Sequence, residues 1–354
     1  MRLPVYMRKK SIRTKALYSC AYRGVCVVLC VLVVCTVLIQ LHFLHYSLTL
    51  DAFVQCRHAV QCVHSPNQMH CVQKESEQSK QSPPKYALAS LLVVVPGEPV
   101  ETYIRHSSVH AYSARSTGKL PCSVDLVLLT VGDLSISQRT RLQQAGWNVL
   151  VVPTIAPPDL VMKSLQITHR WYHMFTKLHF FNMTAYDAVL YMDSDMLVVG
   201  DIADMIPYYH KQMTLHEVPL AWVMDPYIDD THNSGVMLIR PSTELTNDMM
   251  HAAHTRTFIA NWGDQGFINM YFKNNTVDIP LKYNAMPFFW DHIFKNEPYI
   301  WLLGNDIRIL HFTIIKPKHV GDWEEDCKRK RVTYLCRKWS MAYERVELLQ
   351  AESI

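Results

Sequence analysis

The chain has 354 residues, 49% of them hydrophobic and 19% charged, which gives ample apolar material for a large α/β domain and excludes intrinsic disorder as its main state. A single long apolar run excludes a polytopic membrane protein. The formal net charge of +4 comes from seven Lys and Arg residues before Gly24; the remaining 28 basic residues (35 minus 7) face 31 acidic ones.

Residues 24–44 are uncharged and long enough, at about 1.5 Å per helical residue, to cross the hydrocarbon core of a bilayer. The basic segment 1–23 precedes this run, and the first acidic residue is Asp51. This asymmetry predicts a cytoplasmic tail, a signal anchor and a lumenal remainder, hence a single-pass type II protein of the Golgi or ER membrane. A cleaved signal peptide is the alternative, but its apolar region is usually shorter.

Residues 45–85 are rich in Gln, His, Ser and Lys and end in a Ser-Pro-Pro sequence, which predicts a lumenal stem. A small disulfide-linked subdomain is the alternative for this segment. An even number of cysteines beyond the span is compatible with disulfides in an oxidising lumen, with the pairing left open. These cysteines are Cys56, Cys62, Cys71, Cys122, Cys327 and Cys336. Two sequons begin at Asn182 and Asn274 and are usable only on the lumenal side.

From residue 86 onward, short apolar runs alternate with helical patterns. The runs that predict strands buried on both faces are 87–95, 124–131, 149–152 and 188–192. The stretches that predict helices are 100–115, 135–145 and 171–183. This alternation predicts an α/β fold with a largely parallel sheet covered by helices on both faces. In such sheets, ligands bind outside the carboxyl ends of the strands.

Asp193-Ser194-Asp195 directly follows the run 188–192, at such a carboxyl end. In an extended segment, residues two apart point the same way, so the two carboxylates are expected to converge. Oxygen ligands of this kind suit Mg²⁺ or Mn²⁺ and leave positions open for a diphosphate. The alternative is a strand-to-turn junction in which an aspartate caps the next segment.

Five further blocks surround this motif in a fixed order. They are Thr176-Lys177-Leu178-His179, the run VVGDIADMI, His232-Asn233-Ser234-Gly235, Trp262-Gly263-Asp264-Gln265-Gly266, and Ile309-Leu310-His311-Phe312 with Lys316-Pro317. Together, from about residue 86 to 326, they resemble the glycogenin-like members of glycosyltransferase family 8. Tyr103 and the later Ser113-Ala114-Arg115 resemble the first helix of that family. Trp323 and Cys327 resemble residues of plant glucuronosyltransferase-like relatives more than residues of glycogenin.

The resemblance implies a GT-A fold, which is Rossmann-like with a mostly parallel mixed sheet, over residues 86–327, followed by a C-terminal helical extension over 328–354. It implies a UDP-sugar donor, Mn²⁺ with Mg²⁺ as an alternative, and transfer with retention. The implied metal ligands are Asp193, Asp195 and His311. The implied catalytic residues are Asp264, Gln265 and Lys177. The implied donor-binding residues are Tyr103, Lys177, Ser194, Asn233, Ser234 and Lys316.

Each of these residues also has a structural interpretation: Asp264 suits a helix start, and Lys177 and Lys316 suit a solvated surface. We expect Lys316 to neutralise the diphosphate leaving group. The sequence shows no clear second carboxylate that could act as the nucleophile. We therefore favour front-face attack over a covalent intermediate, with Asp264 and Gln265 stabilising the anomeric centre.

Glycogenin glucosylates one of its own tyrosines. The equivalent position in this chain is Asp291, so self-glucosylation is not expected. We therefore expect an Mn²⁺-dependent retaining glycosyltransferase that acts on a glycan, glycoprotein or glycolipid in the secretory pathway. The alternatives are an inactive lectin-like or scaffold subunit and a nucleotide-sugar hydrolase. No nucleic-acid partner is expected, and a homodimer is compatible with the sequence. The chain has no GxGxxG motif after any of these strands and no P-loop, which disfavours an NAD enzyme and a P-loop NTPase.

Overall fold

The computed structural model describes residues 82–95, 100–164, 171–226, 228, 230–286, 306–313 and 333–351. All of them belong to a compact unit that runs from residue 55 to the end of the chain. The predicted tail 1–23, span 24–44 and nearly all of the predicted stem lie outside the described residues. Within the described ranges, no helix combines the length and the apolar character needed to cross a membrane.

A seven-stranded sheet forms the centre of this unit, in the order β3-β2-β1-β4-β7-β6-β8. Its strands are β1 (Tyr86–Val93), β2 (Asp125–Val131), β3 (Asn148–Val151), β4 (Ala188–Met192), β6 (Leu220–Met224), β7 (His232–Ile239) and β8 (Val277–Ile279). β1 to β4 are mutually parallel, β7 runs antiparallel to β4 and β6, and β8 is parallel to β6. The predicted mostly parallel mixed sheet is therefore confirmed.

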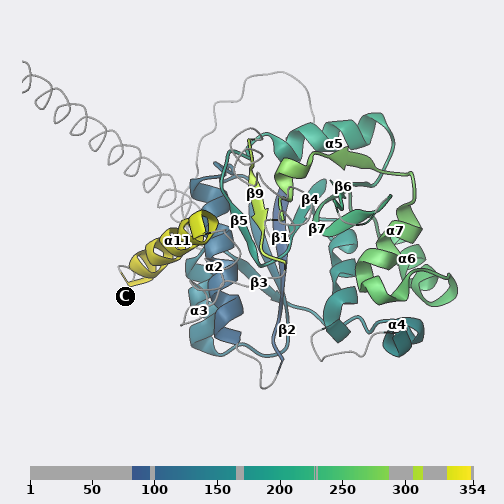
Figure 1. Ribbon diagram of the computed structural model, residues 1–354, viewed down its shortest axis with the longest axis horizontal. Helices are drawn as coiled ribbons and strands as arrows, with labels where there is room; N and C mark the ends of the chain where they lie inside the picture. Colours follow the sequence, from purple (N-terminus) through teal and green to yellow (C-terminus); the bar gives the residue numbers. More distant parts are fainter. Residues whose placement is uncertain are drawn as a thin grey trace, which may run out of the picture. The chain divides into compact units, whose positions relative to one another are not determined.

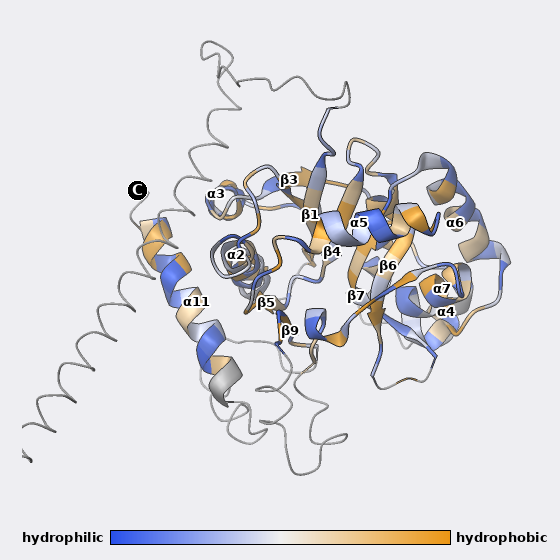
Figure 2. Cartoon of the chain, turned by 90° about the horizontal axis from the view of Figure 1, so that it is seen from above, coloured by the Kyte–Doolittle hydropathy of each residue, from blue (hydrophilic) through white to orange (hydrophobic). Residues whose placement is uncertain are grey.

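Helices cover both faces of the sheet, because successive side chains of each strand point to opposite sides (Figure 1). Leu88 joins one buried core and its neighbour Ala89 joins the other. The first core includes residues of α2 (Val100–Ser116), α3 (Ile136–Gln144) and α5 (Met205–Leu215). The second includes residues of the 3₁₀ helix η2 (Trp171–Asn182), α6 (Thr243–Thr255) and α7 (Gly263–Phe272). Figure 2 shows the hydrophobic residues concentrated along the strands between these two layers.

The sequence around Ser135 explains where α3 begins. Ser135 caps α3, since its hydroxyl accepts a hydrogen bond from the Gln138 backbone N–H, while the Gln138 side-chain oxygen accepts one from the Ser135 backbone N–H. The predicted strand 188–192 is observed with the same bounds, and all five of its residues are buried. The remaining short helices are α4 (Asp159–Ser164), η3 (Ala260–Trp262) and η4 (Leu281–Tyr283).

A second, two-stranded sheet lies beside the first and pairs β5 (Met196–Val198) antiparallel to β9 (Ile309–His311). Its register places Met196 opposite His311, which brings the end of β9 next to the turn that follows β4. The C-terminal helix α11 (Thr333–Ala351) packs on α2 (Figure 1). The Trp339 ring of α11 meets the His106 ring of α2 with 5.8 Å between the ring centroids. The predicted C-terminal extension is thus helical over this range.

Candidate functional site

Asp193 and Asp195 lie in the turn that carries the chain from β4 into β5. The expectation of an extended segment is wrong at this point, and the two carboxylates converge because the chain turns between the two sheets. The Asp193 amide donates to the Gly235 carbonyl at 2.9 Å, and the Phe312 amide donates to the Asp195 carbonyl at 3.1 Å. The turn is therefore fixed on one side to β7 and on the other to the end of β9.

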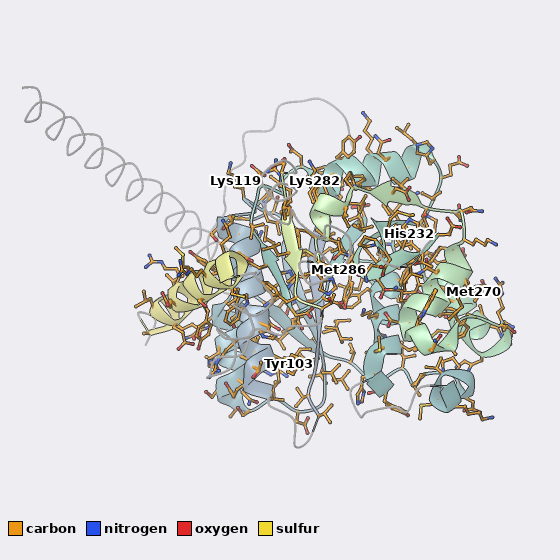
Figure 3. The ribbon with its side chains drawn as sticks, viewed as in Figure 1. Tyr103, Lys119, His232, Met270, Lys282 and Met286 are labelled. Atoms are coloured by element: carbon orange, nitrogen blue, oxygen red, sulfur yellow. The ribbon has the colours of Figure 1, made fainter. Side chains whose placement is uncertain are left out.

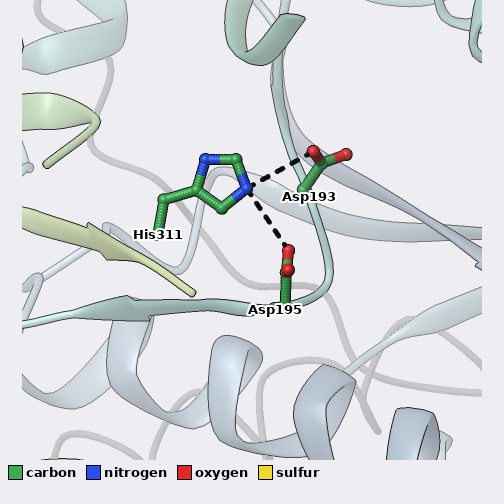
Figure 4. Close-up of side chains that lie close together, drawn as sticks. All are labelled: Asp193, Asp195 and His311. Carbon is green, nitrogen blue, oxygen red and sulfur yellow. Dashed lines mark ion pairs between the residues drawn. The ribbon is translucent and has the colours of Figure 1, made fainter. Parts of the chain in front are cut away.

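The imidazole of His311 faces both carboxylates (Figure 4). Its Nε2 lies 3.7 Å from Asp193 Oδ2 and 3.6 Å from Asp195 Oδ1, and one ligand atom from each of the three residues lies within 4.8 Å of the others. Burial lowers the pKa of His311 to about 4, although the Asp193 charge opposes this shift. The neutral ring presents a nitrogen ligand beside two oxygen ligands, a set that fits a divalent cation.

Lys177, on η2, connects this cluster to a third carboxylate. Its Nζ lies 3.2 Å from Asp193 Oδ1 and 3.0 Å from Asp264 Oδ2. Burial works to lower the pKa of Lys177, but the charges of Asp193 and Asp264 outweigh it and hold this pKa above its ordinary value. Lys177 is therefore a fixed cation inside the site, and the alternative of a solvated helix face is wrong, because the residue is buried.

Asp264, near the start of α7, is fully buried. Its Oδ2 accepts hydrogen bonds from Lys177 and from the Ser234 hydroxyl, the latter at 2.9 Å. Its Oδ1 has no hydrogen-bond partner among the described residues. A buried carboxylate oxygen left unpaired costs about 1–3 kcal/mol or more, so this atom suits a ligand hydroxyl that donates to it.

Gln265 and Asn233 extend the same polar network. Gln265 Oε1 accepts from the Ser234 amide at 3.2 Å and from Asn233 Nδ2 at 3.1 Å, while Gln265 Nε2 donates to Asp225 Oδ2 at 3.1 Å. Sequence reasoning missed Asp225, which is buried directly after β6. The signal was present, since an aspartate at a strand's carboxyl end is the same feature that singled out Asp193.

The structure brings together most of the residues that the sequence predicts for the site: the two catalytic candidates of α7, Lys177, Asn233, Ser234 and the three metal-ligand candidates. Ser194 is half-buried in the same turn as the two aspartates. Tyr103 lies on α2, half-buried, with its ring edge-on to that of His106 at 5.6 Å (Figure 3). Lys316, Trp323, Cys327 and Asp291 lie outside the described residues.

Gly235 is a second residue whose importance the sequence did not reveal. It lies in β7, and a Cβ placed on it would lie 2.6 Å from His311 Cε1. Only glycine allows the imidazole to approach this strand so closely.

The chain is similar to proteins of a known family. The sequence model described as "Glycosyl transferase family 8" matches residues 99–319, more than half of the chain. Inositol phosphorylceramide glucuronosyltransferase 1 of Arabidopsis thaliana is 33% identical over 160 residues, which cover 45% of this chain and 26% of that protein. Glycogenin-1 of Mus musculus is 30% identical over 192 residues, which cover 53% of this chain and 54% of glycogenin-1. The chain therefore spans about a quarter to a half of the length of these relatives.

Among solved structures, an active-site mutant of LgtC superposes with a TM-score of 0.52 at 16% identity, over 73% of this chain and 95% of that one. This similarity concerns the fold alone and agrees with a GT-A-like α/β architecture.

Proposed function

The chain belongs to glycosyltransferase family 8, and on that premise we propose that it transfers a sugar from a UDP-sugar to a glycan, glycoprotein or glycolipid, with retention and with a divalent cation. The observation that carries the proposal is the convergence of Asp193, Asp195 and His311 beside the buried pair of Lys177 and Asp264. An inactive lectin-like subunit has no need of this arrangement of charges.

Asp193, Asp195 and His311 would hold the cation. One imidazole beside two carboxylates favours Mn²⁺ over Mg²⁺, because Mg²⁺ keeps more strictly to oxygen ligands. The bound ion supplies positive charge that stabilises the diphosphate leaving group. Lys316 is the further candidate for contacting that diphosphate.

The residues of α7 and β7 would bind the donor sugar. Asp264 Oδ1 is the open acceptor for a sugar hydroxyl, and Gln265 and Asn233 lie beside it with their amide groups oriented by Asp225 and the Ser234 backbone. Their preorganised dipoles and the Asp264 carboxylate stabilise positive charge at the anomeric carbon.

We infer front-face attack at this carbon. The acceptor oxygen forms the new C–O bond on the face from which the diphosphate leaves, and its proton passes to the departing phosphate oxygen. The contacts of Asp264 Oδ2 with Lys177 and Ser234 support a stabilising role for this carboxylate rather than a nucleophilic one. A glycosyl adduct on Asp264, detected by mass spectrometry, would overturn this inference.

We further propose a type II membrane protein with its catalytic part in the lumen of the Golgi or ER. The basic segment ahead of the uncharged run 24–44 supports this orientation. Cys122 and Cys336 are each in a disulfide, and disulfides persist in oxidising compartments.

The test uses the full-length chain purified in detergent, with Mn²⁺ and a panel of UDP-hexoses, a UDP-pentose and a UDP-uronate; the last is included because one relative is named a glucuronosyltransferase. Donor binding and UDP release are measured with and without glycan acceptors. We expect acceptor-dependent UDP release, reduced about 10²–10³-fold by Asp195→Asn, as for the loss of one electrostatic contact. Binding without turnover would favour the lectin alternative, and acceptor-independent release would favour a hydrolase. If no donor binds and Asp195→Asn changes nothing, the proposal fails.

A further inference from the structure

We propose that Asn284 is a positioning residue that fixes the tautomer of His311, so that the ring carries its proton on Nδ1 and turns the lone pair of Nε2 toward Asp193 and Asp195. Asn284 directly follows η4. The inference rests on the proposed metal site and concerns how the chain prepares one of its ligands.

The argument starts from a group whose hydrogen-bonding role is fixed. The backbone N–H of Gly235 only donates, and it meets the side chain of Asn233 at 3.0 Å. Asn233 must therefore present its carbonyl oxygen, Oδ1, to Gly235. Its Nδ2 then points to acceptors on the other side, and it meets Gln265 Oε1 at 3.1 Å and Asp225 Oδ2 at 3.3 Å.

The orientation of Asn284 follows from that of Asn233. The Asn284 side chain contacts Asn233 Oδ1 at 3.0 Å, and because that oxygen is an acceptor, the contacting atom is the donor Nδ2. The other end of the Asn284 amide, Oδ1, then faces His311 Nδ1 at 2.9 Å. A carbonyl oxygen only accepts, so the proton between these two atoms belongs to His311 Nδ1.

The position of Asn284 is well constrained, as this role requires. It is fully buried, and its backbone N–H donates to the Leu281 carbonyl at 2.9 Å. The next residue, Ala285, exchanges two hydrogen bonds with β9: its amide donates to Ile309 at 3.0 Å, and its carbonyl accepts from His311 at 2.8 Å. Asn284 and the ring it orients therefore belong to one hydrogen-bonded unit, which is how outer residues around a metal ligand raise its basicity and fix its direction.

The first experiment is made on the wild-type protein, and one variant serves only to assign its signals. The full-length chain, labelled with ¹⁵N-histidine, is studied by long-range ¹H–¹⁵N NMR in the absence of added metal at pH 7, and the His311 signals are assigned by their loss in His311→Ala. We expect Nδ1 to be protonated and Nε2 unprotonated. A proton on Nε2, or a ring that exchanges between both tautomers, would overturn the proposal. This readout is independent of metal binding, so wild-type protein with this tautomer but no Mn²⁺ affinity would refute the metal site and leave the role of Asn284 standing.

Variants test the consequence for the ligand. Asn284→Leu removes the acceptor and is expected to abolish the single tautomer and to weaken Mn²⁺ binding, followed by electron paramagnetic resonance, about 10–100-fold. Asn284→Asp keeps an acceptor oxygen and is expected to retain the Nδ1–H tautomer and to bind Mn²⁺ more tightly than Asn284→Leu; loss of the tautomer in Asn284→Asp would count against the proposal.

The matched control is Asn269→Leu, which removes a half-buried asparagine that makes three hydrogen bonds of 2.8 Å, to the backbone of His232 and Gln265. We expect it to leave Mn²⁺ affinity unchanged. If it weakens binding as much as Asn284→Leu does, the effect is a general loosening of the site and the proposal falls.

Discussion

Replacing Gly235 by alanine tests the packing on which the metal-ligand cluster depends. The added Cβ would lie 2.6 Å from His311 Cε1, 3.0 Å from His311 Nδ1 and 2.8 Å from Asn233 Oδ1. Non-bonded carbon atoms keep about 3.5–4.0 Å apart, so the imidazole must retreat by roughly 1 Å or tilt away from β7. Both neighbours are constrained, since His311 is buried and the Asn233 side chain makes four hydrogen bonds.

This displacement of His311 has two consequences, one for the stability of the protein and one for metal binding. Overpacking of a buried site costs about 1–3 kcal/mol of unfolding free energy. Metal–ligand distances tolerate only about 0.2 Å, so a shift of His311 Nε2 by roughly 1 Å removes one ligand from the coordination sphere. We therefore expect Gly235→Ala to lose at least about tenfold in Mn²⁺ affinity, beyond what its lower stability explains.

The measurements are Mn²⁺ titration followed by electron paramagnetic resonance and thermal unfolding on the same samples. Gly118→Ala is the control, because its Cβ would be equally crowded, at 2.6 Å from Ala114 O and 2.8 Å from Val198 Cγ1, without touching a ligand. It is expected to lose stability and keep its Mn²⁺ affinity. Wild-type affinity in Gly235→Ala, or equal affinity losses in the two variants, would refute the reasoning.

Three further predictions concern charge, pH and topology. Lys177→Met removes the cation that pairs with buried carboxylates and should lower the unfolding free energy by about 3–5 kcal/mol. Adding Asp264→Asn should recover part of this loss, and no recovery would contradict the ion pair. His110 is fully buried, neither ring nitrogen has a hydrogen-bond partner among the described residues, and burial lowers its pKa to about 4. The unfolded chain therefore binds more protons between about pH 6.5 and 4, so the unfolding free energy falls as the pH is lowered through that window. His110→Leu should raise the unfolding free energy by about 1–3 kcal/mol and flatten its dependence on pH, measured by urea titration; an unchanged slope would argue against this reasoning. Asn274 is exposed in the turn before β8, whereas the Asn182 side chain accepts a hydrogen bond from Thr243 at 2.9 Å. In secretory expression we therefore expect a higher N-glycan occupancy at Asn274 than at Asn182, measured by peptide mass spectrometry. An unmodified Asn274 beside a glycosylated Asn182 would contradict this prediction.

The central strands and the acidic turn could be predicted from the sequence because their causes are local. β1, β2 and β4 are buried on both faces, so each reads as a nearly continuous apolar run, and an aspartate pair directly after such a run stands out. The pairing of β5 with β9 leaves no such pattern. Each strand has three residues, and they lie more than a hundred residues apart, so their pairing is decided by tertiary packing. The roles of Gly235 and Asn284 depend on that pairing, which is why no local motif revealed them.

The charges of the site argue for a cation on their own. Asp193, Asp195 and Asp264 bring three negative charges into a largely buried cluster, and His311 is neutral at physiological pH. Lys177 contacts two of these carboxylates, those of Asp193 and Asp264. A divalent ion between the two aspartates and the imidazole adds positive charge to this acidic cluster, whereas a diphosphate entering first would add negative charge to it. The electrostatics therefore favour an order in which the metal binds before, or together with, the nucleotide sugar. Against the effect of burial, the charges of Asp193 and Asp264 raise the pKa of Lys177, so this residue acts as a fixed cation rather than as a titrating base.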